Sequence, residues 1–455
     1  MERMKMAQGV EWTASSTAGL AASPPARITL RWLIRASLCF SFLLAFLQYE
    51  VSSGIGGMLS LAVLAFCGML VLFGRQRTER VQHILGGGGL LFAAALLFGE
   101  AISYTSHDTY SALYGLVFVG VFLSARLIVQ EIGVPGVIRA YSQAGILTLS
   151  LSLITGRHTL FAGASGRFNG GTRAHPNLIS FIYGGFLPVI VWRAMEEKAG
   201  WKKWVLIGLS FAAFGLIFIT GSRGTLSAVL VAGAALLARG LSGGWLERFR
   251  VRHLHVVLLL IVVPFAVAFL LQHNRIGQVG SFLVDFLSLN SSQRGVKSGL
   301  SGRTGMWQIA FRVLRTHNRW LFGFGYRAGD RLVGTIDDGY VQLLFESGLI
   351  GGGLVLGSML RVFFLLWKVS NLRENNAWTR YYAMLWYLMI VYFLNNISTR
   401  YLFSFGSPFS ICILFLMAAS RRELVGGGVR ARLAQKVKPP PRVAAQGLAW
   451  NRSGK

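Results

Sequence analysis

The residues that are best suited to take part in a reaction lie in one polar stretch, between Ser301 and Gly352. It contains two adjacent carboxylates, Asp337 and Asp338, in a chain of 455 residues that has only 17 Asp and Glu. Neighbouring carboxylates at the edge of an apolar region disfavour each other's charge, which makes one of them a good proton acceptor. Asp337 is therefore the first candidate for a general base and Asp338 the second. The alternative for Asp337 is a structural one, because aspartate is also a preferred cap for the helix expected to follow.

Arginine accompanies these carboxylates and recurs in two other connectors. Arg303 lies in the same stretch, Arg223 lies in a very short connector, and Arg173 lies in the connector 157–176. A guanidinium stays charged and binds phosphate oxygens through two parallel hydrogen bonds. These arginines are therefore candidates for binding an anionic group such as a pyrophosphate. The alternative for Arg223 is an arginine whose head reaches the membrane interface. The alternative for Arg303 is a solvated residue at the start of a helix.

Three further side chains flank these groups. His175 lies at the expected start of a helix and could bind a sugar or a phosphate, or could be a hydrogen-bonded interface histidine. Tyr340 could stack on a sugar ring, although aromatic residues are also common at membrane interfaces. Glu346 shares one helical face with Asp338 and Gln342, and it could orient the arginines.

The elements that position these residues are long apolar segments. The chain is 53% hydrophobic and 14% charged, whereas a soluble chain carries about 25% charged residues. Apolar runs of roughly 18–20 residues recur and are long enough to cross a bilayer as helices. Cysteines 39, 67 and 412 fall inside these runs and are expected to be packing residues. We expect about twelve spans, at 32–49, 54–73, 83–104, 110–129, 136–156, 177–195, 203–220, 224–239, 255–271, 347–367, 382–398 and 403–420.

The formal net charge of +28 does not indicate a nucleic-acid-binding protein, because the basic residues are divided among short connectors. They concentrate in alternate connectors, as the positive-inside rule predicts for cytoplasmic loops. Both ends are then cytoplasmic: residues 1–26 and 421–455 are expected to be disordered tails around a transmembrane domain at 27–420. A long external loop at about 272–346 contains Arg303 and both aspartates.

Inside this loop, Gly302 to Thr316 has the spacing of an amphipathic helix. Its apolar residues recur at every third or fourth position: Trp307, Ala310, Phe311 and Leu314. Such a helix could lie on the outer membrane surface with its aromatic side chains among the lipid headgroups. The following Phe322 to Gly325 predicts a turn.

These features resemble the bacterial O-antigen ligase and O-antigen/exopolysaccharide polymerase superfamily. The resemblance rests on the long external loop between the ninth and tenth expected spans and on three motifs. The motifs are Thr220-Gly221-Ser222-Arg223-Gly224, Ser301-Gly302-Arg303 with Trp307 and Gly323-Phe324-Gly325, and Asp337-Asp338-Gly339-Tyr340 with Glu346. It implies an all-α, polytopic fold of the GT-C type in the bacterial inner membrane, with the active face on the periplasmic side.

The resemblance also implies a chemistry. The donor would be a glycan linked to undecaprenyl pyrophosphate, whose anomeric carbon is attacked by a sugar hydroxyl without a cofactor or metal. Ligases of the family usually have His-Asn where this chain has Asp337 and Asp338. We therefore expect a polymerase of lipid-linked repeat units, with a chain-length regulator as a potential partner. The alternatives are a ligase that transfers the glycan to a lipid or other acceptor, and a transporter of lipid-linked glycans.

Overall fold

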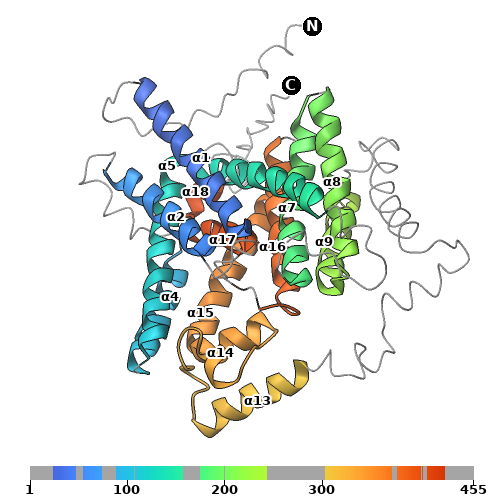
Figure 1. Cartoon of the computed structure of the whole chain (residues 1–455). Helices are drawn as coiled ribbons and strands as arrows, with labels where there is room; N and C mark the ends of the chain where they lie inside the picture. The colour runs from blue at the N-terminus through green and yellow to red at the C-terminus, as the bar shows by residue number, and fades with distance from the viewer. Residues whose placement is uncertain are drawn as a thin grey trace, which may run out of the picture.

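The computed structural model describes residues 24–47, 55–73, 89–106, 108–156, 175–198, 200–242, 303–370, 377–400, 402 and 407–425. All regular secondary structure within these residues is helical, as the sequence predicts (Figure 1). In chain order the helices are α1 (Pro24–Leu47), α2 (Ile55–Phe73), α4 (Leu90–Thr105), α5 (Thr109–Thr155), α7 (Pro176–Glu196), α8 (Trp201–Ile219), α9 (Arg223–Ser242), α13 (Arg303–Thr316), α14 (Ala328–Leu332), α15 (Gly339–Ser370), α16 (Ala377–Asn395), α17 (Pro408–Ala418) and α18 (Arg421–Val425).

Within the described residues, five helices contain segments that are long and apolar enough to cross a membrane. These segments are Leu30–Leu47, Thr109–Thr155, Pro176–Glu196, Trp201–Ile219 and Gly339–Ser370. Shorter apolar segments lie in α2, α4, α9 and α17: Met58–Phe73, Leu90–Thr105, Arg223–Leu236 and Pro408–Ala418. The protein is therefore a helical, membrane-embedded protein. Twelve spans remain a prediction, and the expected ninth span at 255–271 lies outside the described residues.

Helix α5 joins two of the expected spans across a sharp break. Gly133 has a non-helical backbone (φ 69°, ψ 165°), and Pro135 follows two residues later. A left-handed glycine and a proline interrupt the hydrogen-bond ladder, which explains the kink. In Figure 1 the half of α5 that follows the break runs across the bundle in a clearly different direction from the first half.

The centre of the bundle is packed with aromatic side chains from α5, α7 and α17. The rings of Tyr141 and Phe186 lie 4.7 Å apart, and those of Phe181 and Phe409 lie 4.9 Å apart. Gly185 passes between them, since a Cβ there would overlap Phe409 and the Tyr141 hydroxyl. The three cysteines are free thiols on α1, α2 and α17; Cys67 and Cys412 are buried and Cys39 is half-buried, in agreement with their predicted role as packing residues.

The segment from α13 to the start of α15 forms a cap, residues 303–347, at one end of the bundle (Figure 1). Its small core consists of five buried residues: Ala310, Leu314, Ala328, Ile336 and Phe345. Helix α13 forms where the apolar spacing predicts it. Its aromatic face does not point toward the lipid headgroups as expected, because Trp307 and Phe311 pack on this core. The apolar face of α13 is thus used inside the cap and is not free to enter the lipid headgroups.

The cap is joined to α15 at a second glycine kink. Gly348 has a positive φ of 63° inside α15, which leaves backbone groups on either side without helical partners. Four backbone hydrogen bonds of 2.8–3.2 Å then link segment 320–325 to segment 345–350. Gly323, with φ 74°, lies so close to the Glu346 carbonyl that a Cβ would collide with it. The chain therefore turns at 322–325, as predicted, because its backbone packs directly against the kinked backbone at 345–350.

Candidate functional site

The C-terminal end of α16 and the residues that follow it, Phe393 to Arg400, connect α9, which begins at Arg223, with α15, which follows Asp338. We call this segment the α16 hub. Asn395 Nδ2 donates a hydrogen bond to Thr225 Oγ1 near the start of α9 (2.8 Å). The backbone N–H of Gly339, at the start of α15, donates to the Asn396 carbonyl oxygen (2.9 Å). The hub therefore holds the N-terminal ends of α9 and α15 at the same end of the bundle.

Arg223 is the first residue of α9. A turn with Gly221 at φ 64° precedes it, and the buried Ser222 and Thr225 hydroxyls lie 3.2 Å apart in a hydrogen bond. Gly224 packs against Ser398 of the hub so closely that a side chain would collide. The short connector therefore places a guanidinium at the positive end of a helix, and both favour a negatively charged group.

Asp338 is the cap of α15. Its Oδ1 accepts hydrogen bonds from the backbone N–H groups of Tyr340 (2.8 Å) and Val341 (2.9 Å). The residue is 5% exposed. Burial raises the pKa of the Asp338 carboxyl above its ordinary value, against the opposing effects of these two hydrogen bonds and of the Arg303 charge. The capping role considered for Asp337 thus belongs to its neighbour.

Asp337 has a different environment from Asp338. Its side chain is exposed, and among the residues the structure describes no donor bonds its carboxylate. Arg303, the first residue of α13, is close enough to Asp338 for its charge to act on that carboxylate. The start of α13 therefore lies near the start of α15, where Asp338 is buried within reach of the Arg303 charge and Asp337 is exposed.

Tyr340 and Glu346 both lie on α15 and have partners within the protein. The Tyr340 hydroxyl donates to the Phe393 carbonyl oxygen (2.8 Å), which ties α15 to the α16 hub. Gln342 Nε2 donates to Glu346 Oε1 (2.8 Å), so these two residues share a helical face as the spacing predicts. Neither contact excludes a ligand from the rest of each side chain.

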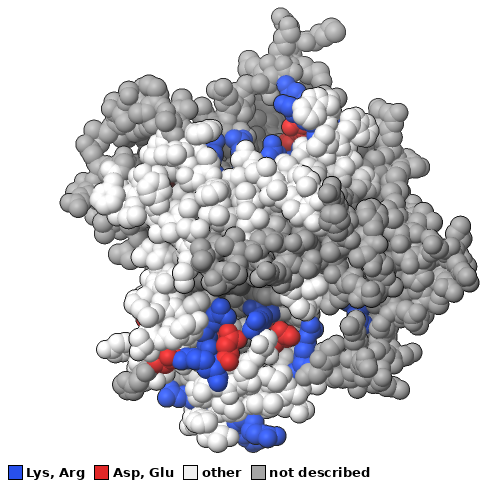
Figure 2. Space-filling view, viewed as in Figure 1, with Lys and Arg blue, Asp and Glu red and all other residues white. Residues whose placement is uncertain are grey.

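Three arginines that the sequence left without a role form ion pairs in the cap. Asp330 of α14 lies between two of them: Arg327 Nη1 is 2.8 Å and Arg400 Nη1 is 3.0 Å from its two carboxylate oxygens. The Arg327 guanidinium also lies over the Tyr114 ring, 5.0 Å from its centroid. In Figure 2, basic and acidic side chains gather together on the visible face of the cap.

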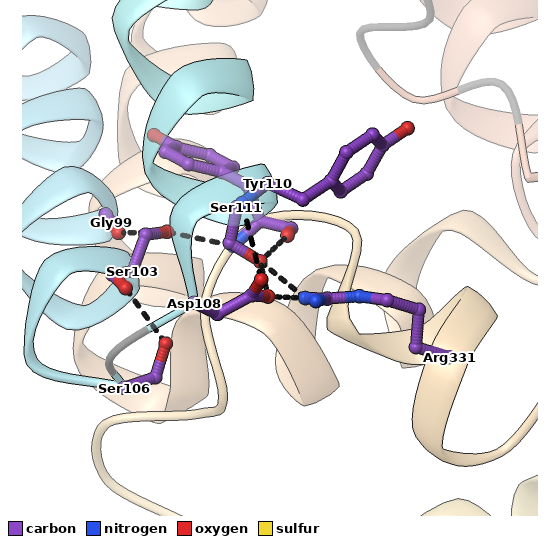
Figure 3. Close-up of polar contacts among 8 residues, drawn as sticks. Gly99, Ser103, Ser106, Asp108, Tyr110, Ser111 and Arg331 are labelled. Atoms are coloured by element: carbon purple, nitrogen blue, oxygen red, sulfur yellow. Dashed lines mark hydrogen bonds and ion pairs between the residues drawn. The ribbon is translucent and has the colours of Figure 1, made fainter.

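The third arginine, Arg331, pairs with Asp108 at the start of α5 (Figure 3). It also donates to Ser111 Oγ (2.6 Å), and its guanidinium lies 5.5 Å from the centre of the Tyr110 ring. Asp108 in turn accepts from the Tyr110 backbone N–H (3.2 Å), so it caps α5 at the same time. These three arginines therefore fasten the cap to the bundle. Arg331 has an acidic partner of its own, whereas Arg327 and Arg400 share the single carboxylate of Asp330.

Tyr326 anchors the cap more deeply, between α4 and α5. Its hydroxyl donates to the Leu96 carbonyl oxygen (3.0 Å), and its backbone N–H donates to Ser103 Oγ (2.9 Å). Gly99 and Gly115 provide the space, because a Cβ at either position would overlap the Tyr326 ring. The turn that contains the Gly323-Phe324-Gly325 motif leads directly into this anchor.

The remaining predicted residues are less closely connected with the hub. His175 caps α7, since its Nδ1 accepts from the Asn177 backbone N–H (3.2 Å), and its side chain is exposed. Arg173 lies outside the described residues. The structure thus brings Arg223, Arg303 and Asp338 to one end of the bundle, and it leaves His175 as a separate helix cap.

The sequence interpretation missed the hub residues themselves. Asn395 and Asn396 are fully buried, and their Oδ1 atoms, together with Gln342 Oε1, are buried without a hydrogen-bond partner in the described structure. The polar run Asn395 to Arg400 at the end of an apolar helix was the feature of the sequence that could have indicated them.

Comparison with known protein families and with characterised proteins finds no match. The site must therefore be interpreted from its own chemistry.

Proposed function

We propose that this protein is a membrane glycosyltransferase that polymerises undecaprenyl-pyrophosphate-linked oligosaccharide repeat units into a surface polysaccharide. The observation that supports this proposal most directly is that the α16 hub holds the starts of α9 and α15, which bring Arg223 and Asp338 to one end of the bundle, where the charge of Arg303 also acts on Asp338. Cations for a phosphate and a carboxylate for a proton are the two requirements of glycosyl transfer from a lipid pyrophosphate. The proposed site faces the periplasm.

The arginines would act on the leaving group. As the bond between the anomeric carbon and the phosphate oxygen breaks, negative charge grows on the pyrophosphate. Arg223 would stabilise this charge together with the positive end of α9, and Arg303 would add a second guanidinium at the start of α13. Their fixed charge requires no proton transfer, and the lipid pyrophosphate leaves as the anion.

A carboxylate would act on the attacking group. The hydroxyl oxygen of the acceptor sugar forms the new bond to the anomeric carbon, and its proton passes to Asp337. Asp337 suits this role because its side chain is exposed, whereas Oδ1 of Asp338 is occupied by two backbone N–H groups. Asp338 would instead be a positioning residue that holds the start of α15 beside Arg303.

The hub would contribute to binding of the sugars. The buried oxygens of Asn395, Asn396 and Gln342 have no donor among the described residues. Such atoms are costly to leave unpaired, and neutral carbonyl oxygens suit the hydroxyl groups of a glycan better than a phosphate. Tyr340 bonds to Asp338 through its backbone N–H and to the Phe393 carbonyl oxygen of the hub through its hydroxyl, and its ring could contact a sugar face.

Cells that lack this protein provide the test, with surface and lipid-linked glycans separated on a gel. Loss of long polymer while single repeat units are still made would support polymerisation. Long polymer that accumulates on the lipid carrier would identify a ligase instead. Repeat units retained on the cytoplasmic leaflet would identify a transporter and would leave Arg223, Arg303 and Asp337 without the proposed roles.

A further inference from the structure

Glu100 is the only charged residue of the apolar helix α4, which has 16 residues. It precedes Thr105, the last residue of α4, by five positions, a distance of roughly 7.5 Å at 1.5 Å per residue. The cap docks at this end of the helix, because the Tyr326 backbone N–H donates to Ser103 Oγ there. An ionisable side chain within an apolar helix is costly in a membrane, so its presence indicates a function.

The Glu100 carboxylate lies where α4, α5 and the cap meet, a junction that we call the seam. A Cβ on Gly115 of α5 would collide with Glu100 Oε2 and would lie 2.7 Å from Tyr326 Cδ2. The carboxylate oxygen and the Tyr326 ring therefore converge on the same point of α5, and the charge of Glu100 acts on Tyr326. Because Tyr326 anchors the cap, Glu100 belongs to the site in which this anchor docks.

The Oε2 atom of Glu100 is buried and has no hydrogen-bond partner among the described residues. Two hydroxyl donors of the seam are already used. The Tyr326 hydroxyl donates to the Leu96 carbonyl oxygen (3.0 Å), and the Ser103 hydroxyl donates to the Gly99 carbonyl oxygen (2.9 Å) (Figure 3). A carboxylate that is buried without donors is much less stable than the neutral carboxylic acid in the same place.

The elements packed against α4 do not supply a cation for Glu100 within the described ion pairs. The guanidinium of Arg327 bonds to Asp330 (2.8 Å) and lies over the Tyr114 ring of α5. Glu346 of α15, whose charge also acts on the Tyr326 ring, has the same sign of charge as Glu100. The other charged or titratable groups where the cap meets α5 contact one another: Asp108, Arg331 and Tyr110. These surroundings favour the neutral form of Glu100.

We propose that Glu100 is a proton-binding site and that docking of the cap requires its neutral, protonated form. When the proton leaves for water, the carboxylate charge must be hydrated, and water reaches Oε2 only if the seam around the Tyr326 ring opens. Protonation therefore holds the cap on the bundle, and deprotonation loosens it. The proposal does not rest on the glycosyltransferase activity, because it involves neither a glycan nor the arginines proposed to bind pyrophosphate.

Labelling of the full-length protein in lipid nanodiscs with N,N′-dicyclohexylcarbodiimide tests the proton site. This apolar reagent reacts with a protonated carboxyl group: the carboxyl oxygen bonds to the central carbon of the reagent, the proton passes to a reagent nitrogen, and acyl transfer to that nitrogen leaves a stable N-acylurea. At about pH 6 an ordinary glutamate is ionised. Mass spectrometry of the digested protein should find the adduct on Glu100 at this pH and should lose it as the pH rises.

The control carboxylate for this labelling is Glu196, which is exposed and lies 2.8 Å from Arg380 Nε. It should remain unlabelled by the apolar reagent. Absence of the adduct on Glu100 at about pH 6, or an amount of adduct that does not change with pH, would overturn the proton-binding site. The labelling requires no glycan, so its outcome is independent of the proposed glycosyl transfer.

Limited proteolysis tests whether this proton controls the cap. The wild-type cap should be cut faster as the pH rises, whereas Glu100→Gln, which keeps a neutral side chain of the same size, should protect the cap at every pH. Each rate is divided by that of the unfolded protein at the same pH, because the protease itself depends on pH. Glu196→Gln, which removes an exposed carboxylate, is the matched control and should follow wild type. The same pH dependence in Glu100→Gln as in wild type would overturn the coupling.

Discussion

The backbone N–H of Gly339 donates a hydrogen bond to the carbonyl oxygen of Asn396 (2.9 Å), which joins the first residue of α15 to the end of α16. A Cβ on Gly339 would lie 3.0 Å from Asn396 Oδ1 and 3.1 Å from Leu402 Cβ. The close approach requires a small residue directly after the two aspartates. The position of both carboxylates relative to Arg223 therefore depends on this contact and on Asn395, which holds the start of α9.

The first prediction separates the two carboxylates. Asp337→Asn should abolish polymer because it removes the proposed proton acceptor, and it should leave the thermal unfolding temperature unchanged because that side chain is exposed. Polymer is measured on gels of surface glycan, with Asp338→Asn as the control. Near-normal polymer in Asp337→Asn would remove this residue from the mechanism.

Asp338 should behave as a cap. Asparagine caps helices about as well as aspartate, so Asp338→Asn should fold normally and retain most of the polymer, whereas Asp338→Ala should lose about 1 kcal/mol of stability. Unfolding of the purified protein in detergent measures the difference. If Asp338→Asn were as inactive as Asp338→Ala while remaining stable, the charge of Asp338 and not its capping hydrogen bonds would be essential.

The same residue predicts a dependence of stability on pH. Burial raises the pKa of Asp338 in the folded protein above its ordinary value of 3.8. Its stabilising contribution is therefore complete below the unfolded value and is lost as pH rises through the higher folded value. Relative to Asp338→Asn, wild type should lose stability as the pH rises from the ordinary value of 3.8 through the higher folded pKa. If the difference in unfolding temperature between wild type and Asp338→Asn did not change as the pH rises, the raised pKa of Asp338 would be contradicted.

The arginines proposed to bind pyrophosphate can be compared with an exposed arginine of the same cap. Arg223→Ala and Arg303→Ala should each lower glycosyl transfer roughly a hundredfold, the usual effect of losing one group that stabilises transition-state charge. Arg312→Ala is the control, because Arg312 lies exposed on α13 with Arg303 but outside the hub. Activity is measured as transfer of labelled repeat units in membranes. Equal activity in all three variants would exclude the phosphate-binding role.

Tyr326 should be essential for attachment of the cap. Tyr326→Ala removes a buried ring from between α4 and α5, a change that costs about 3–5 kcal/mol for large aromatic residues. The cap should then be cut faster in limited proteolysis, with the bundle intact. Leu332→Ala, which truncates an exposed residue of the same cap, should not change the cleavage rate. Equal protection from proteolysis in both variants would show that the ion pair of Arg331 with Asp108 holds the cap on the bundle without Tyr326.

The amino-acid sequence by itself determined the local features. Apolar runs dictate helices because a backbone in lipid must bond within its own segment, and the spacing of Trp307, Ala310 and Leu314 predicts α13 because it reflects the helical period. The turn at Gly323 and Gly325 was likewise readable, since positive φ favours glycine. Each of these depends on neighbours within a few residues.

Only the tertiary structure decided the contacts between distant residues. It assigned the cap of α15 to Asp338, paired Arg331 with Asp108, and buried the apolar face of α13 against the cap core. It also made Asn395 and Asn396 the connection between α9 and α15. A charge or an amide in a sequence has many equally suitable partners, and only the packing of the helices determines which of them lies within bonding distance.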